Sequence, residues 1–292
     1  MDRLQRQDKV QLQNVTYTYS ANTPFEKEAL SDVSVGFAAG RITGLIGHTG
    51  SGKSTLVQML NGLLRPMQGK VYLDGLDIWE NPKEIRQVRF RVGLVMQYPE
   101  YQLFDETVMA DIGFGPKNMG LDAQEIRQRC LEAAAFAGVH PSLFDKSPFE
   151  LSGGEKRRVA IAGVLAMKPE VLILDEPAAG LDPRGRKTVL SGIRRYNRET
   201  GATVILVSHS MEDLATYCDE AVVMKGGQVY ARGQIADIFT RTQELVAIGL
   251  DVPQIARVAA LLQKEGIALQ GTLYTVEGVE EAILKYIGGV KN

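Results

Sequence analysis

Residues 42–64 read ITGLIGHTGSGKSTLVQMLNGLL. The apolar run at 42–46 predicts a buried strand, and the periodic pattern at 55–64 predicts a helix. Between them lies a stretch that fits the phosphate-binding pattern Gly-x4-Gly-Lys-Ser/Thr, made of Gly47, His48, Thr49, Gly50, Ser51, Gly52, Lys53 and Ser54. The pattern binds phosphate when it lies between a strand and a helix, in that order, as it does here. The alternative is a plain glycine-rich turn, which does not need that context.

The residue types in this loop match the chemistry of a bound nucleotide. Glycines let the backbone approach phosphate closely, so that consecutive N–H groups and the helix N-terminus surround the β-phosphate. Lys53 is expected to reach the β- and γ-phosphates, and the Ser54 hydroxyl is expected to ligate Mg²⁺. Thr55 follows directly, and we assign it to the same nucleotide-binding set.

A second stretch, residues 171–176, reads VLILDE and predicts a buried strand that ends in two carboxylates. An Asp at the carboxyl edge of a parallel sheet supports Mg²⁺ in nucleotide sites, so Asp175 is the expected metal residue. Glu176 is expected to be the catalytic base that orients or deprotonates the attacking water. Acidic pairs after strands also occur as helix caps, so this motif predicts a metal site only in combination with the phosphate loop.

Apolar runs at 92–96, 204–207 and 221–224 alternate with helical patterns and predict parallel strands of one α/β sheet. Runs at 10–18, 33–37 and 70–73 predict an antiparallel β element. Between 97 and 151 strand patterns are missing and helical periodicity appears. The expected fold class is α/β: a P-loop NTPase domain over residues 9–240, with a RecA-like core, an antiparallel β subdomain and a helical insertion subdomain at about 98–160.

A small C-terminal α/β appendage is expected over residues 245–292. Its first helix, over 252–264, starts around Pro253 and stops before Gly266, and a second helix is expected over 279–287. Between them, residues 269–276 predict a strand. The composition of this part does not indicate a function.

The composition limits the classes of function. The chain has 292 residues, 45% of them hydrophobic, which suffices for one large domain with an appendage. The formal charge is −2, from 33 Lys and Arg against 35 Asp and Glu, so bulk charge gives no case for a nucleic-acid binder. The longest clean apolar stretch, residues 159–167, is far shorter than the ~20 residues that cross a bilayer. Any role in transport is therefore expected to need a membrane-spanning partner.

Residues 151–155 read LSGGE, and here the sequence resembles the ABC ATPase family, whose LSGGQ signature it matches except at the last position. The resemblance implies a signature motif at a helix N-terminus that contacts the γ-phosphate held by a second subunit, through Ser152, Gly153, Gly154 and Glu155. A carboxylate at residue 155 would be repelled by a triphosphate unless it is turned away or paired with Lys156 or Arg157.

The other motifs of this family follow in the expected order. Gln97, after the strand at 92–96, resembles the residue that touches Mg²⁺ and reports to the membrane partner. Asp182, in the run GLD at 180–182, resembles the D-loop residue. His209 resembles the catalytic switch histidine that contacts the γ-phosphate.

An aromatic residue near the start of these proteins stacks on the adenine base, and Tyr19 is the best match. Tyr17 and Phe25 lie close to it in the sequence and remain alternatives. An aromatic residue on a strand face also occurs simply as part of a core.

Within the ABC proteins, the chain is similar over nearly its whole length to the second ATPase subunit of energy-coupling factor transporters. The likeness is carried by IGHTGSGKST at 46–55, QYPEYQLF at 97–104 and SPFELSG at 147–153, among others. It implies an ATPase that uses ATP and Mg²⁺ to power import of a vitamin or metal ion, as a peripheral protein at the cytoplasmic face of the cell membrane. The implied partners are a second ATPase subunit in a heterodimer, a transmembrane coupling protein and a substrate-capturing membrane protein, with no nucleic acid.

Residues 98–104, which we call the docking segment, combine aromatic and acidic residues directly after Gln97. We expect them to border a groove that receives helices of the coupling protein, with Glu100 or Asp105 accepting an arginine from that partner. The alternative is that Leu103 and Phe104 pin the helical insertion to the core.

Other functions share these motifs: another ABC importer or exporter, or an ABC ATPase that acts on nucleic acid or ribosomes. The nucleic-acid classes carry a long coiled-coil insertion or two ATPase units, and this chain has neither sustained heptads at 97–151 nor a second phosphate loop. A subunit that only binds nucleotide would not need Lys53, Asp175, Glu176 and His209 together. Co-purification of a membrane protein, as against ribosomes or DNA, separates the main alternatives.

Overall fold

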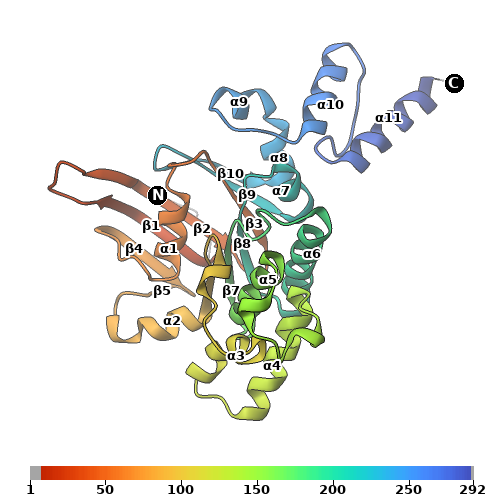
Figure 1. Ribbon diagram of the computed structural model, residues 1–292. Helices are drawn as coiled ribbons and strands as arrows, with labels where there is room; N and C mark the ends of the chain where they lie inside the picture. The colour runs from red at the N-terminus through yellow and green to blue at the C-terminus, as the bar shows by residue number, and fades with distance from the viewer. Residues whose placement is uncertain (1–7, 291–292) are drawn as a thin grey trace.

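The computed structural model describes residues 8–290 and confirms the α/β core. At its centre is a six-stranded sheet in the order β10-β9-β3-β8-β7-β6 (Figure 1). Its strands are β3 (Ile42–Ile46), β6 (Val92–Val95), β7 (Val171–Asp175), β8 (Thr203–Val207), β9 (Glu220–Lys225) and β10 (Gln228–Gln234). All neighbours pair in parallel apart from the β9–β10 hairpin, so the five strands predicted from apolar runs are the parallel ones.

A second sheet of four antiparallel strands, in the order β2-β1-β4-β5, corresponds to the predicted antiparallel element. Its strands are β1 (Asp8–Tyr19), β2 (Lys27–Ala38), β4 (Gln68–Leu73) and β5 (Leu76–Asp77). In Figure 1 it forms the red and orange side of the molecule. The register of β1 and β2 sets Tyr19 opposite Lys27, which has a consequence for the nucleotide site.

Helix α1 (Lys53–Leu60) begins inside the phosphate loop and ends earlier than predicted, because Gly62 has φ of +71° and the chain turns away there. The helical insertion consists of α3 (Val108–Asn118), α4 (Ala123–Ala137) and α5 (Gly153–Leu165), which pack against one another. The other helices are α2 (Ile85–Arg91), α6 (Pro183–Thr200), α7 (Met211–Tyr217), α8 (Ile235–Thr240), α9 (Thr242–Ala247), α10 (Gln254–Lys264) and α11 (Val276–Val290). In the part of the chain that the structure describes, none is long and apolar enough to cross a membrane.

The central sheet is buried on both faces. Along β7, Leu172 and Leu174 join an apolar cluster that includes the helical insertion and α6, whereas Val171 and Ile173 join a cluster with α1 and the antiparallel sheet. All four side chains are fully buried. A strand that is apolar on both faces is what a continuous apolar run predicts. The polar residues that follow these strands are therefore gathered at the edge of the sheet.

The C-terminal part contains α10 and α11, but the strand predicted at 269–276 is wrong, since residues 269–275 form a loop between the helices and Val276 begins α11. A strand needs neighbours, and no other strand of residues 8–290 lies there to pair with it. Gly271, with φ of +113°, also breaks an extended path. Leu269 is buried for another reason, because it packs in a small separate cluster with Ala259, Val279 and Ala282.

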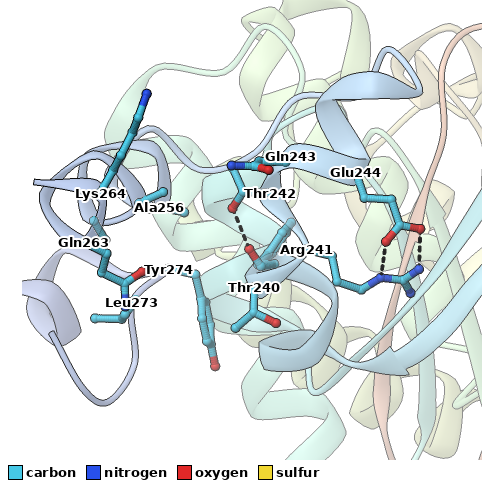
Figure 2. Close-up of a pocket in the computed structure, with 13 residues that line it drawn as sticks. Thr240, Arg241, Thr242, Gln243, Glu244, Ala256, Gln263, Lys264, Leu273 and Tyr274 are labelled. Atoms are coloured by element: carbon cyan, nitrogen blue, oxygen red, sulfur yellow. Dashed lines mark hydrogen bonds and ion pairs between the residues drawn. The ribbon is translucent and has the colours of Figure 1, made fainter. Parts of the chain in front are cut away.

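A cavity of about 730 Å³ lies between this C-terminal part and helices α8 and α9 (Figure 2). On one side Arg241 forms an ion pair with Glu244, and Tyr230 Oη donates a hydrogen bond to Glu244 Oε1 at 2.6 Å. Lys264 and Tyr274 line the other side. No residue that the sequence motifs single out lines this cavity, so the nucleotide chemistry lies elsewhere.

Candidate nucleotide-binding site

A smaller cavity, of about 260 Å³, brings together predicted residues from stretches far apart in the sequence. It lies at the carboxyl edge of the central sheet, where ligands bind in open α/β folds. The predicted residues in its wall are Tyr19, Thr49, Gly50, Gly52, Lys53, Ser54, Thr55, Gln97, Asp175, Glu176 and His209. Gly47, His48 and Ser51 complete the loop without lining the cavity, and Lys27 and Ala29 of β2 line it without having been predicted.

The phosphate loop requires glycine at residue 52 for two reasons. Its φ is +102°, which L side chains rarely adopt, and a Cβ there would lie 2.6 Å from the carbonyl oxygen of Ala29. Gly50 also has a positive φ, of +81°, but a Cβ there would meet no atom within 4 Å. The loop is thus packed on β2 at Gly52 and leaves open space at Gly50 for a ligand.

Lys53 is folded back onto the loop. Its Nζ donates hydrogen bonds to the carbonyl oxygens of Gly47 at 2.6 Å and His48 at 3.1 Å, and the residue is buried. Burial lowers the pKa of Lys53, while the charges of Asp175 and Glu176 act in the opposite direction. An ammonium group has three donors, so one is left for a phosphate oxygen.

Asp175 and Glu176 stand at the end of β7, facing the loop. Burial raises the pKa of both carboxyls, and for Glu176 burial together with the charge of Asp175 raises it to about 7. Glu176 Oε1 is buried and has no hydrogen-bond partner within residues 8–290, and His209 Nε2 lies 3.7 Å from it. A carboxyl group that titrates near neutral pH and has an unused acceptor is suited to general-base chemistry.

The backbone at Glu176 is unusual as well. Its φ is +54°, in the left-handed region that side chains other than glycine seldom occupy. The N–H of Glu176 donates to the carbonyl oxygen of Val207 on β8 at 3.0 Å, which holds this conformation. Strained backbone of this kind is concentrated at functional sites, because the surrounding structure has to compensate for it.

The oxygen-rich side of the cavity fits Mg²⁺. Ser54 Oγ donates to Asp175 Oδ2 at 3.3 Å, and Gln97 lines the same cavity. Mg²⁺ is usually held by one or two protein groups together with phosphates and water, and it does not need an all-protein cage. Ser54, Asp175 and Gln97 are the residues that would hold it.

Of the three aromatics considered for the adenine base, the structure places Tyr19 at the cavity. Its Oη is 3.2 Å from Thr55 Oγ1, and its ring packs edge-to-face on Tyr17 with centroids 5.0 Å apart. Tyr17 packs against the apolar cluster behind it, and Phe25 is 84% exposed and outside the cavity. Lys27 reaches the same wall through the β1–β2 register, which no motif in the sequence reveals.

The signature residues do not line this cavity. Ser152 caps α5, and its N–H and Oγ both donate to Glu155 Oε2, at 2.9 and 2.6 Å. Glu155 is therefore turned onto the N-terminus of its own helix, in a capping box. The hydrogen bonds from Ser152 lower the pKa of Glu155. Arg157, one of the two cations considered as its partner, pairs with Glu100 instead.

The D-loop residue and the switch histidine differ in how firmly they are held. Asp182 caps α6, and its Oδ1 accepts a hydrogen bond from the N–H of Gly185 at 2.7 Å. His209 follows β8, and its side chain is 61% exposed at the mouth of the cavity. His209 is thus free to meet a ligand, whereas Asp182 already has a partner in its own chain.

Comparison with known proteins agrees with this geometry. Residues 30–179 match the family described as ABC transporter. An energy-coupling factor transporter ATP-binding protein EcfA2 of Caldanaerobacter subterraneus is 48% identical over 97% of this chain and 99% of its own length. The protein of the same name from Symbiobacterium thermophilum is 50% identical over 95% of this chain and 96% of its own length.

Solved structures show the same fold. The structure of cbiO1 from Clostridium perfringens, described as part of the ABC transporter complex cbiONQ, has a TM-score of 0.74 at 36% identity and covers 88% of this chain and 99% of its own. The dimeric ATP-binding cassette MJ0796 bound to ADP and Pi has a TM-score of 0.71 at 28% identity, over 77% of this chain and 98% of its own. The chain therefore belongs to the ABC transporter family, as an ATP-binding and ATP-hydrolysing subunit of the energy-coupling factor type.

Proposed function

We propose that this chain is one of two different ATPase subunits that sit on a transmembrane coupling protein, at the cytoplasmic face of the membrane, and power import of a vitamin or metal ion. One observation carries the proposal. The nucleotide residues converge on one cavity, whereas the signature residues Ser152 to Glu155 stand outside it. A signature motif that cannot serve its own nucleotide has a role only at the site of a second subunit.

Each residue of the cavity has a distinct role in binding or hydrolysing ATP in this proposal. Lys53, with one free donor, would bind the β- and γ-phosphates, and Ser54 and Asp175 would hold Mg²⁺, which supplies charge neutralisation between the phosphates. Glu176 would accept a proton from the attacking water or orient it, since its Oε1 is buried without a partner. His209 would contact the γ-phosphate from the mouth of the cavity, and Tyr19 would stack on the base.

The docking segment supports contact with a membrane partner, in a revised form. Tyr101 is 84% exposed and Phe104 57% exposed, so both offer apolar surface to another protein. Glu100 already pairs with Arg157 of its own chain, which favours Asp105 over Glu100 as the acceptor of a partner's arginine. Leu103 is buried in the main apolar cluster, and the Phe104 ring packs edge-to-face on Phe114 of α3 with centroids 4.8 Å apart, which supports the alternative that these two residues also pin the insertion. Docking is therefore proposed for Tyr101, Phe104 and Asp105.

The test is the dependence of ATPase activity on subunit concentration. The chain alone, kept monomeric, should hydrolyse ATP poorly, and activity per molecule should rise and saturate as the second ATPase subunit is added. Ser152→Arg, which blocks the signature position without touching the cavity, should bind ATP normally yet abolish the activity gained on mixing. A monomer whose rate is strictly proportional to its own concentration, and unchanged by the partner, would refute the proposal.

A further inference from the structure

The one buried arginine of the signature helix has no role in the mechanism described above. Arg157 lies on α5, two residues after the signature motif, and is only 4% exposed. Charged residues are almost never this deeply buried unless they are paired. Its partner is Glu100 of the docking segment, 57 residues earlier in the chain.

The pair has the geometry of a firm connection. Arg157 Nε donates to Glu100 Oε2 at 3.0 Å and Nη2 donates to Glu100 Oε1 at 2.7 Å, so that the contact is bidentate. The Glu100 side chain is also largely buried, at 16% exposure. Bidentate pairs between guanidinium and carboxylate fix orientation as well as distance, which a single lysine contact does not.

A second residue of the docking segment and a second segment of the chain lie beside the same guanidinium group. Its Cζ lies 5.9 Å from the ring centroid of Tyr98, the residue that follows Gln97. A Cβ added at Gly180 would lie 4.0 Å from Arg157 Nη1, so the run at 180–182 passes beside it. From its base on the signature helix, this one side chain thus contacts two residues of the docking segment and lies beside the run at 180–182.

We propose that Arg157 is a positioning residue that joins the docking segment to the signature helix, so that both move as one body when nucleotide closes the site. This inference rests on the proposed function. Since α5 begins at the residues that meet the partner's nucleotide, any displacement of α5 would be delivered through Glu100 to the exposed Tyr101 and Phe104. Packed contacts with discrete arrangements are the physical carriers of such coupling.

Spin-label distances measured by electron paramagnetic resonance test the connection in the complex of the chain with its ATPase partner. Labels would replace Tyr101, Arg127 on α4, which packs against α5, and Arg198 at the end of α6 on the core; all three are exposed. In the wild type, adding ATP and Mg²⁺ should change the 101–198 distance and leave the 101–127 distance constant. Arg157→Met and the milder Glu100→Gln should both broaden the 101–127 distribution and let it vary with nucleotide.

Arg194→Met is the matched control, because it removes an ion pair of intermediate exposure, between Arg194 on α6 and Asp219, that does not involve the docking segment. It should lower Tm without changing the 101–127 distribution, which separates positioning from general destabilisation. In the full membrane complex, Glu100→Gln should lower ATPase activity relative to the soluble pair by about 2- to 30-fold, the range for residues on a coupling path.

Unchanged 101–127 distributions in both Arg157→Met and Glu100→Gln would overturn the inference. So would a 101–127 distance that already varies with nucleotide in the wild type. If ATP changes no distance in the wild type, the proposed function is wrong, and the two variants still decide whether Arg157 fixes the segment.

Discussion

Glu176 has a buried oxygen without a hydrogen-bond partner in the described chain, at a backbone position with φ of +54°. Glu176→Gln keeps the shape and removes the base. We expect the assembled variant to bind ATP with near-normal affinity and to turn it over ~10²-fold more slowly or worse, as for loss of a positioned base. Glu199→Gln, an exposed exchange on α6, is the control and should leave the rate unchanged. Normal turnover in Glu176→Gln would show that another group activates the water.

The same residue predicts a pH dependence of stability in the nucleotide-free protein. The pKa of Glu176 is raised from 4.5 to about 7, so between these values the folded chain holds a proton that the unfolded chain releases. The free energy of unfolding therefore falls as pH rises through this window. Glu176→Gln has no carboxyl to ionise and does not lose this free energy of unfolding. Its Tm should therefore match that of the wild type near pH 4.5 and exceed it by a few °C at pH 8. Thermal scans at both values measure this, and a constant difference in Tm would contradict it.

Glu155 is the residue at which the signature motif departs from the family pattern, and the structure shows its carboxylate engaged by Ser152. Glu155→Gln can keep the capping box and removes the charge that a partner's triphosphate would meet. We expect unchanged Tm and a gain in ATP-driven pairing of up to ~10-fold, the effect of about 1.4 kcal/mol. Glu155→Ala keeps Ser152 as the N-cap but removes the reciprocal hydrogen bonds to its N–H and Oγ, so its Tm should fall below that of Glu155→Gln. Equal pairing by wild type and Glu155→Gln would show that the charge is turned away completely.

At the scale of elements, the docking segment contains both exposed side chains and a buried, ion-paired one, which the sequence alone could not distinguish. Tyr101 is 84% exposed, whereas Glu100 is largely buried in its ion pair with Arg157. We expect Tyr101→Ala and Asp105→Lys to keep Tm and ATP binding and to lose assembly on the membrane protein. Glu100→Lys should instead lower Tm, because it leaves a buried cation facing another. Sedimentation with membranes and thermal scans measure the two effects, and normal assembly of Tyr101→Ala and Asp105→Lys would refute docking here.

The strands and the nucleotide loop could be predicted because each depends on residues that are adjacent in sequence. The run at 42–46 followed by the loop at 47–54 specifies strand, turn and anion site within a few residues. Lys27 could not be predicted, because its place at the cavity depends on the register between β1 and β2. The Arg157–Glu100 pair could not be predicted either, since no pattern links positions 57 residues apart. Sites formed by neighbouring residues can therefore be predicted from the sequence, whereas contacts between distant residues become visible only in the folded structure.

At the scale of the whole molecule, the same distinction explains the wrong strand. Residues 269–276 include β-branched and aromatic side chains, yet a strand exists only where another strand offers its backbone, and α10 and α11 offer none. The two sheets supply such neighbours for all the strands that were predicted before residue 225. The strand predictions were therefore correct where the chain joins a sheet, and the one at 269–276 was wrong because it lies in the small helical C-terminal unit.

That small unit has a thermodynamic consequence. Among the described residues its own cluster holds four buried residues, Ala259, Leu269, Val279 and Ala282, and Tyr274 links it to Phe239 of α8, with ring centroids 6.0 Å apart, beside the large cavity. So little buried apolar surface gives a low free energy of local opening, whereas strands β3, β7 and β8 open only when the whole domain unfolds. Hydrogen-exchange mass spectrometry should find amides of α10 and α11 exchanging orders of magnitude faster than those of β7, and equal protection would contradict this. The C-terminal helices are therefore expected to melt and refold while the nucleotide site stays intact, so that a change in their order need not alter catalysis.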